Sequence, residues 1–207
     1  TSAITLDEGD VLIGADLTDG AHSVMLFSDA GKALRFDENE VRPMGRTARG
    51  VGGMKIRPED RIIAMIVAND EGQMVLTATE NGYGKRTPIA EYTMHGRNTM
   101  GMIAIATTER NGKVVAACLV DENDEVILLT KKGKLVRIPV CDIRICSRAT
   151  QGVKLVNLKD DDLVSVTPVK DQGGDDAEPA PEGGEGEGSE DGPADPSPEE
   201  TPSLDDL

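Results

Sequence analysis

The chain has 207 residues and a formal net charge of −16, and 38% of its residues are hydrophobic but only 2% are aromatic. Its core must therefore be aliphatic, and the sequence has no run of about 18 apolar residues that would predict a membrane-spanning helix. The three cysteines form no Cys-x-x-Cys pair, which argues against a disulfide framework or a zinc site and fits a reducing, cytoplasmic environment.

The strands expected from the sequence are short and apolar, and turn signals separate them. In chain order they cover residues 24–27, 32–36, 61–67, 74–79, 102–105, 126–129 and 134–138. The Asn81-Gly82 pair is typical of a tight hairpin, because such turns need positive φ angles. No segment shows sustained helical periodicity. We therefore predict an all-β chain whose units have the strand content of propeller-like blades.

These units repeat at a spacing of 51 residues. A period near 50 with two glycine landmarks indicates one supersecondary unit copied around an axis. The matching columns are Gly31, Gly82 and Gly133; Arg35, Arg86 and Arg137; Glu40, Glu91 and Asp142; Arg46, Arg97 and Arg148; and Gly50, Gly101 and Gly152. About three blades fit, fewer than a closed ring needs. We therefore expect a partial disc with an uncovered apolar face at its N-terminal edge.

The negative charge is concentrated at the C-terminal end. Residues 171–207 contain 14 of the 38 acidic residues and no Lys or Arg, so residues 1–170 are nearly neutral. A stretch of this composition cannot bury enough apolar surface to offset the loss of chain entropy. We predict a domain of blades over residues 1–170 and a disordered acidic tail over residues 171–207.

The most suggestive chemistry lies in loops with the pattern small-Arg-x-x-x-Gly, which begin at Gly45, Gly96 and Ser147. Glycine lets the backbone turn so that its N–H groups face outward beside the arginine, which suits contact with phosphate. Two other interpretations stay open: the recurring arginines could pair with acids inside the blades, or the cations could be ordinary surface charges. The candidate DNA-binding residues are Lys32, Arg35, Arg46, Arg49, Lys55, Lys85, Arg86, Arg97, Lys131, Lys132, Lys134, Arg137, Arg148 and Lys154.

Enzyme chemistry finds little support in the residues. His22 and His95 are the only histidines, and neither has a plausible nucleophile and acid partner in the sequence. The loop 45–50 lacks the Gly-Lys-Ser/Thr ending of a nucleotide-binding loop. The acidic segment 121–125 lacks the glycine of a calcium loop. We expect no catalytic, cofactor or metal site in this chain.

The segment 81–87 (NGYGKRT), the Arg-x-x-x-Gly loops, residues 24–28 and the acidic tail together resemble the C-terminal domain of bacterial DNA gyrase A. The resemblance covers residues 1 to about 170. It implies a six-bladed β-pinwheel, roughly half of it present here, with duplex DNA wrapped around its basic rim. It also implies a parent ATP-dependent type II topoisomerase, an A2B2 heterotetramer of gyrase A and gyrase B in which ATP and Mg²⁺ serve the holoenzyme and negative supercoiling is the outcome.

Two motifs of that family are absent. The Gln-Arg-Arg-Gly-Gly-Lys-Gly box of its first blade does not occur, and neither does the catalytic tyrosine of the breakage-reunion domain, since Tyr92 stands in a different context. We therefore expect a non-catalytic DNA-binding module. The alternatives are a protein-interaction propeller and the corresponding domain of topoisomerase IV.

Overall fold

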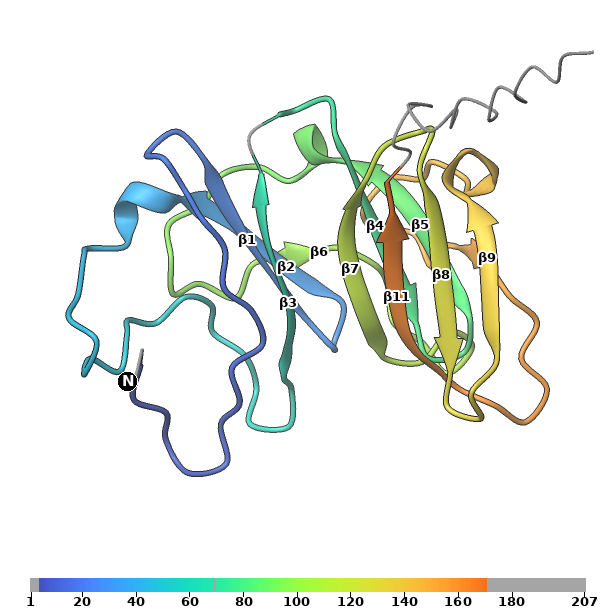
Figure 1. Cartoon of the computed structure of the whole chain (residues 1–207), viewed down its shortest axis with the longest axis horizontal. Helices are drawn as coiled ribbons and strands as arrows, with labels where there is room; N and C mark the ends of the chain where they lie inside the picture. Colours follow the sequence, from blue (N-terminus) through green and yellow to red (C-terminus); the bar gives the residue numbers. More distant parts are fainter. Residues whose placement is uncertain (1–3, 69, 171–207) are drawn as a thin grey trace, which may run out of the picture. The chain divides into compact units, whose positions relative to one another are not determined.

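The computed structural model describes residues 4–68 and 70–170, and the predicted acidic tail lies outside them. The described part is built from three antiparallel sheets, which confirms the predicted all-β class (Figure 1). The strands are β1 Ser23–Ser28, β2 Lys32–Asp37, β3 Ile62–Ala68, β4 Met74–Thr79, β5 Tyr83–Pro88, β6 Met102–Ile103, β7 Val114–Val120, β8 Glu125–Thr130, β9 Leu135–Pro139, β10 Val153–Lys154 and β11 Leu163–Val169. The short 3₁₀ turns are η1 Glu38–Glu40, η2 Ile89–Glu91 and η3 Val140–Asp142.

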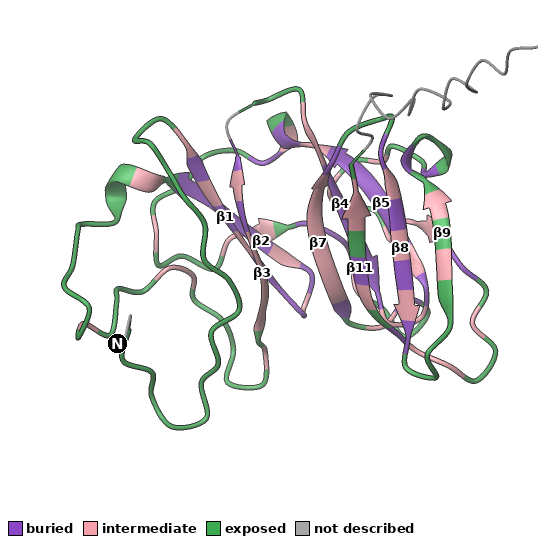
Figure 2. Cartoon of the chain, in the orientation of Figure 1, coloured by how far each residue is buried: buried purple, intermediate pink, exposed green. Residues whose placement is uncertain are grey.

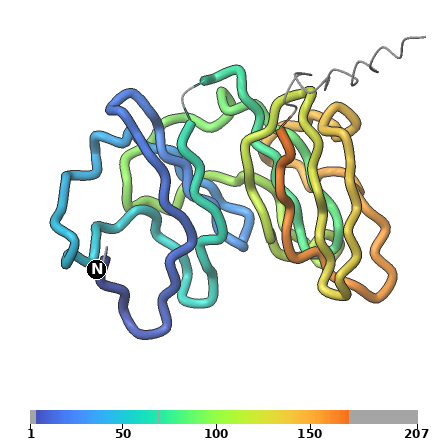
Figure 3. The backbone as a smooth tube through the Cα atoms, in the orientation of Figure 1, coloured from blue at the N-terminus to red at the C-terminus, as the bar shows by residue number. Residues whose placement is uncertain are grey.

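Neighbouring units exchange strands. The first sheet has the order β3-β1-β2-β6 and the second has the order β10-β5-β4-β7. Strand β6 follows the β4–β5 hairpin in the chain but pairs with β2, and β10 follows the β8–β9 hairpin but pairs with β5 (Figure 3). Each of these two sheets is therefore completed by a strand of the next unit. The third sheet, β11-β8-β9, has no such strand within the described residues.

The core lies between successive sheets. Met25 and Phe27 of β1 pack against Val75 and Tyr92 of the second unit, and the rings of Phe27 and Tyr92 meet edge to face with centroids 6.0 Å apart. On the other side of the second sheet, Leu76 joins the cluster formed with the third sheet. Because successive residues of a strand point to opposite faces, β4 contributes to both cores.

The first sheet has one apolar face that no neighbouring sheet of the described residues covers. Val24, Leu26, Met65 and Val67 line a groove of about 770 Å³ on this face. The segment 4–20 that precedes β1 is exposed throughout (Figure 2). The apolar face expected at the N-terminal edge is thus present, but it is half-buried, and loop residues such as Thr18, Met44 and Val51 line the same groove.

The hairpin glycines adopt the positive φ angles expected of them, with 77° at Gly82 and 81° at Gly133. Their surroundings differ. A Cβ added at Gly82 would lie 2.7 Å from the carbonyl oxygen of Val156, whereas one added at Gly133 would meet nothing within 4 Å. The difference follows from strand exchange, because the third hairpin has no following unit against it in the described part.

Substituting alanine at the two glycines should therefore have unequal effects. We expect Gly133→Ala to lower the free energy of unfolding by about 1 kcal/mol, from the positive φ alone. Gly82→Ala should lower it by about 3 kcal/mol, because steric overlap with Val156 adds to the same strain. Urea denaturation followed by circular dichroism measures both. Equal losses would contradict the steric argument.

Candidate nucleic-acid interface

The arginine column on the second hairpin strand serves the fold in the first two units. Arg35 and Arg86 are only 7% and 3% exposed. Arg86 Nε donates to the carbonyl oxygen of Ile143 at 2.7 Å, and Arg35 Nη1 donates to that of Tyr92 at 3.3 Å. Each side chain thus ties its sheet to the residue that ends the 3₁₀ turn of the next unit. Arg35 and Arg86 are buried, and their side chains are already hydrogen-bonded to backbone carbonyl groups. We therefore do not include them in the candidate interface.

The third member of this column has a different environment. Arg137 lies on β9, and its side chain is 62% exposed and pairs with the carboxylate of Glu125. No following unit lies against β9 within the described residues, so Arg137 has no carbonyl groups to bind there. The same repeat position is therefore structural in one unit and available to solvent in another.

Lys85 is a third candidate that the structure places inside the protein. Its side chain is fully buried, and Nζ donates to the carbonyl oxygens of Ser147 and Arg148, both at 2.6 Å. Burial lowers the pKa of this ammonium to about 8. A neutral amine still has two N–H donors for the two carbonyls. Lys85 therefore stabilises the third Arg-x-x-x-Gly loop by binding two of its carbonyl groups from the interior of the protein.

The lowered pKa predicts a pH dependence of stability. The unfolded chain holds more protons than the folded chain between the folded pKa of about 8 and the ordinary value of 10.5, so the free energy of unfolding rises with pH in this window. This contribution is lost as the pH falls through 8. Relative to Lys85→Met, the unmodified chain should gain more than about 1 kcal/mol between pH 8 and 10. Parallel pH profiles in urea denaturation would contradict this prediction.

The arginines of the Arg-x-x-x-Gly loops bridge successive units. Arg97 Nη1 donates to the carbonyl oxygen of Gly52, and Arg148 Nη1 donates to that of Ile103, both at 2.8 Å. The recurring acid accepts the backbone N–H of the arginine rather than its side chain, as from Arg148 to Glu91 at 2.9 Å. These half-buried arginines therefore join the units through one side-chain nitrogen.

The loop cations of the first unit are more open. Arg46 is exposed. Arg49 is also exposed, but its side chain pairs with Asp7 at 2.8 Å. In the first loop, Arg49 thus has a nearby counter-charge, whereas Arg46 shows no ion pair among the described residues.

The remaining candidates gather at the hairpin turns, which lie in one row. Val114, at the start of β7, donates its N–H to Asp29 in the first turn at 2.9 Å, and Leu163, at the start of β11, donates to Glu80 in the second turn at 2.7 Å. Strand β11 also pairs with β8, which leads into the third turn. We call this row the basic hairpin edge. Its cations are Lys32, Lys55, Arg57, Arg110, Lys131, Lys132, Lys134 and Lys154.

Counter-charges differ along the basic hairpin edge. Lys32, Lys55 and Arg57 line a groove of about 240 Å³ whose lining includes a single acid, Asp60. At the third turn, Lys131 Nζ lies 3.5 Å from a carboxylate oxygen of Asp162. Lys132 there donates from Nζ to the carbonyl oxygen of Asp160 and from its backbone to the Asp161 carboxylate. The first turn is therefore less neutralised than the third.

Arg57 and Arg110 belong to this edge although neither was among the candidates. Arg110 lies over the ring of Tyr83, with Cζ 4.6 Å from the ring centroid. The repeat could not have found Arg110, because the segment between β6 and β7 differs in length from the segment between β10 and β11. The polar run 108–112, which ends in Asn-Gly, was the available signal for an exposed turn.

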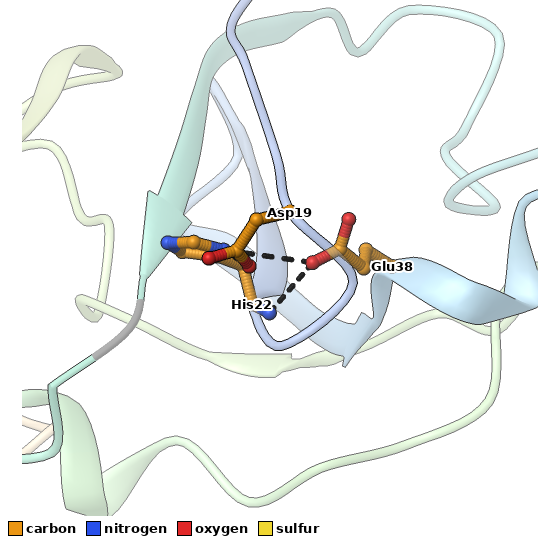
Figure 4. Close-up of side chains that lie close together, drawn as sticks. All are labelled: Asp19, His22 and Glu38. Atoms are coloured by element: carbon orange, nitrogen blue, oxygen red, sulfur yellow. Dashed lines mark hydrogen bonds and ion pairs between the residues drawn. The ribbon is translucent and has the colours of Figure 1, made fainter.

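One cluster of ionisable side chains lies away from this edge. Asp19, His22 and Glu38 place one ligand-type atom each within 4.8 Å of one another (Figure 4). His22 Nδ1 lies 2.7 Å from Asp19 Oδ1, and Glu38 Oε1 accepts the backbone N–H groups of Gly20 and His22 at 2.9 and 2.6 Å. The hydrogen bond from Thr18 is the largest cause of a lowered pKa at Glu38. The cluster fastens the turn before β1 onto η1.

Among residues 4–68 and 70–170, no helix has the length and apolar character needed to span a bilayer.

A family comparison and a search for similar proteins point to the same family. A family described as the DNA gyrase C-terminal domain, beta-propeller, matches residues 22–69, 73–120 and 124–170. The DNA gyrase A protein of Klebsiella oxytoca is 50% identical over 190 residues, which cover 91% of this chain and 22% of that protein. The DNA gyrase A protein of Pseudomonas aeruginosa is 47% identical over 184 residues, covering 88% and 20%. The chain thus spans about a fifth of the length of these relatives.

Two solved structures share the fold. The C-terminal domain of DNA topoisomerase IV superposes with a TM-score of 0.77 at 27% identity, over 81% of this chain and 53% of that one. The DNA gyrase A C-terminal domain superposes with a TM-score of 0.73 at 28% identity, over 80% of this chain and 57% of that one. Each superposition therefore extends over most of the blades of this chain.

Proposed function

This chain belongs to the family of DNA gyrase C-terminal β-propeller domains, and from that premise we propose that it binds duplex DNA along the basic hairpin edge and bends it. The observation that carries the proposal is the row of three adjacent hairpin turns, each with exposed cations. Cations along such a row suit phosphates that are distributed along one duplex. Contacts of this kind tolerate any base sequence.

The physical basis of binding is counterion release. Each phosphate that a lysine or arginine neutralises frees condensed cations, so the affinity falls as salt rises. Propeller units are arranged around an axis, so a row of turns follows a curve and favours bent DNA. Bending 20–30 base pairs costs on the order of 1–6 kcal/mol, which added phosphate contacts must offset.

At the level of the whole protein, we propose that the chain is the DNA-wrapping part of the gyrase A protein of a cytoplasmic, ATP-dependent type II topoisomerase, which works with gyrase B as an A2B2 assembly. Its relatives are DNA gyrase A proteins. We further propose that ATP and Mg²⁺ act in other parts of the holoenzyme, while this chain contributes DNA-binding surface. Wrapping with one handedness would present a second DNA segment for strand passage in one orientation, and this would direct negative supercoiling.

The acidic residues 171–207 lie outside the described residues, and only their charge bears on function. We propose that they form a segment separate from the blades. With 14 acidic and no basic residues, this segment would repel DNA or compete with it for the cations of the basic hairpin edge.

The test is duplex binding by the 207-residue chain as a function of salt. We expect the logarithm of the association constant to fall linearly with the logarithm of salt concentration, by about 0.9 for each phosphate contacted. Fluorescence anisotropy with a labelled duplex of about 40 base pairs measures this, since such a length exceeds the 20–30 base pairs of a typical bent site. Absence of duplex binding at low salt would overturn the proposal and favour a protein-interaction propeller.

A further inference from the structure

At the middle hairpin turn, two cations lie near one aromatic ring. Arg110 Cζ lies 4.6 Å and Lys154 Nζ 5.6 Å from the centroid of the Tyr83 ring. From this arrangement we propose that Tyr83, Arg110 and Lys154 form a phosphate-binding site for one phosphodiester group of duplex DNA. The proposal rests on the DNA-binding function proposed above and identifies a site within it.

Neither cation has a carboxylate partner in the part of the chain that the structure describes. Within residues 4–68 and 70–170, neither Arg110 nor Lys154 takes part in an ion pair. The carboxylate of Glu80, in the same turn, accepts the backbone N–H of Lys113 at 2.9 Å. Two like charges beside one ring repel each other, and a shared anion removes that repulsion. The site therefore carries positive charge that suits an anionic ligand.

The ring has a further role in placing the cations. Strand pairing sets Lys154 of β10 directly opposite Tyr83 of β5. A hydrogen bond from Arg110 is the largest cause of a lowered pKa at the Tyr83 hydroxyl, and the charge of Lys154 acts in the same direction. A cation over an aromatic face is attracted by the ring quadrupole. Tyr83 is thus a positioning residue, and the two cations are the binding groups.

Two asparagines fix the turn that carries Arg110. Asn81 Nδ2, in the hairpin turn, donates to the carbonyl oxygens of Glu109 and Arg110, both at 3.2 Å. Asn111 is fully buried, and its Nδ2 donates to the carbonyl oxygen of Gln151 at 3.2 Å, in the loop before β10. The three segments that supply the site are therefore tied together before any ligand arrives, which reduces the entropy lost on binding.

The repeat supports phosphate as the ligand. Tyr83 occupies the column that carries Lys32 in the first unit and Lys134 in the third. Where the middle unit has the tyrosine, positive charge comes instead from Lys154 and Arg110, on neighbouring segments. Positive charge is thus present at every hairpin although its source changes. A polyanion is the ligand that such a surface fits.

The test compares variants of the 207-residue chain in duplex binding against salt. The double variant Arg110→Ala/Lys154→Ala should lower the affinity about ten-fold and the magnitude of the salt slope by about 0.9, the value for one phosphate. Tyr83→Phe keeps the ring but removes the hydroxyl that Arg110 contacts, so it should lose less affinity than Tyr83→Ala. Tyr83→Ala should lose affinity because the cations lose their platform. Circular dichroism confirms that each variant folds.

Lys113 provides the matched control. It lies three residues from Arg110 and is exposed, but its Nζ is paired with Asp29 at 2.8 Å, so Lys113→Ala should leave the salt slope unchanged. If the unmodified chain binds duplex but the double variant keeps its slope, or if Lys113→Ala lowers the slope equally, this site is overturned while the proposed function stands. If the unmodified chain binds no duplex, the proposed function fails, and the site with it.

Discussion

Replacing Arg86 with alanine should lower the free energy of unfolding by about 3–4 kcal/mol, whereas the same change at Arg137 should lower it by less than about 0.5 kcal/mol. Arg86 is 3% exposed and donates to the carbonyl oxygens of Ile143 and Cys141 at 2.7 and 3.2 Å. Truncation leaves the buried carbonyl oxygen of Ile143 without this donor and opens a cavity between two units. Arg137 is exposed and loses only its pair with Glu125.

The two positions are matched because they occupy the same place in their sheets. Arg86 is opposite Leu76 in the β4–β5 pair, and Arg137 is opposite Ile127 in the β8–β9 pair. Urea denaturation followed by far-ultraviolet circular dichroism measures both variants. Arg86→Lys should fall between them, because it keeps the charge but not the forked geometry that reaches two carbonyls. Similar losses at Arg86 and Arg137 would show that bridging to the next unit is not what stabilises this region.

The hairpins could be predicted from the sequence because their signals are local. Alternating apolar residues and the Asn81-Gly82 pair determine where a strand ends and turns. Strand exchange could not be predicted in this way, because β6 and β10 are two residues long and their partners lie more than 60 residues earlier. The strand expected over residues 102–105 ends at Ile103, because the N–H of Ala104 turns to the carbonyl oxygen of Gly31 at 2.8 Å.

The candidate site was harder to predict than the fold, because equivalent residues of the repeat can be buried in one unit and exposed in another. Arg35 and Arg137 share a column, and only the presence of a following unit decides which of them is covered. Lys85 did carry a usable signal, since its column holds Leu34 and Val136 in the other units. An aliphatic column indicates a position that faces the interior. The cations of the hairpin turns show no such column of apolar neighbours.

Removing Lys55 and Arg57 together should weaken duplex binding about ten-fold near 0.1 M salt and lower the magnitude of the salt slope by about 1.8, the value for two phosphates. Removing Lys131 and Lys132 together should have a clearly smaller effect. The first pair shares its groove with the single acid Asp60. The second pair stands beside three consecutive aspartates, residues 160–162, so part of its charge is already neutralised within the protein.

A double variant of equal charge change supplies the control. Lys113 and Lys170 are both exposed, and both are ion-paired, to Asp29 at 2.8 Å and to Asp121 and Asp124 at 2.7 Å. Changing both to alanine alters the net charge by the same amount as either pair at the turns, yet should leave the salt slope unchanged. If all three double variants weakened binding equally, net charge rather than contact would govern affinity. A graded result, largest for Lys55 and Arg57, requires that DNA lie against the first hairpin turn.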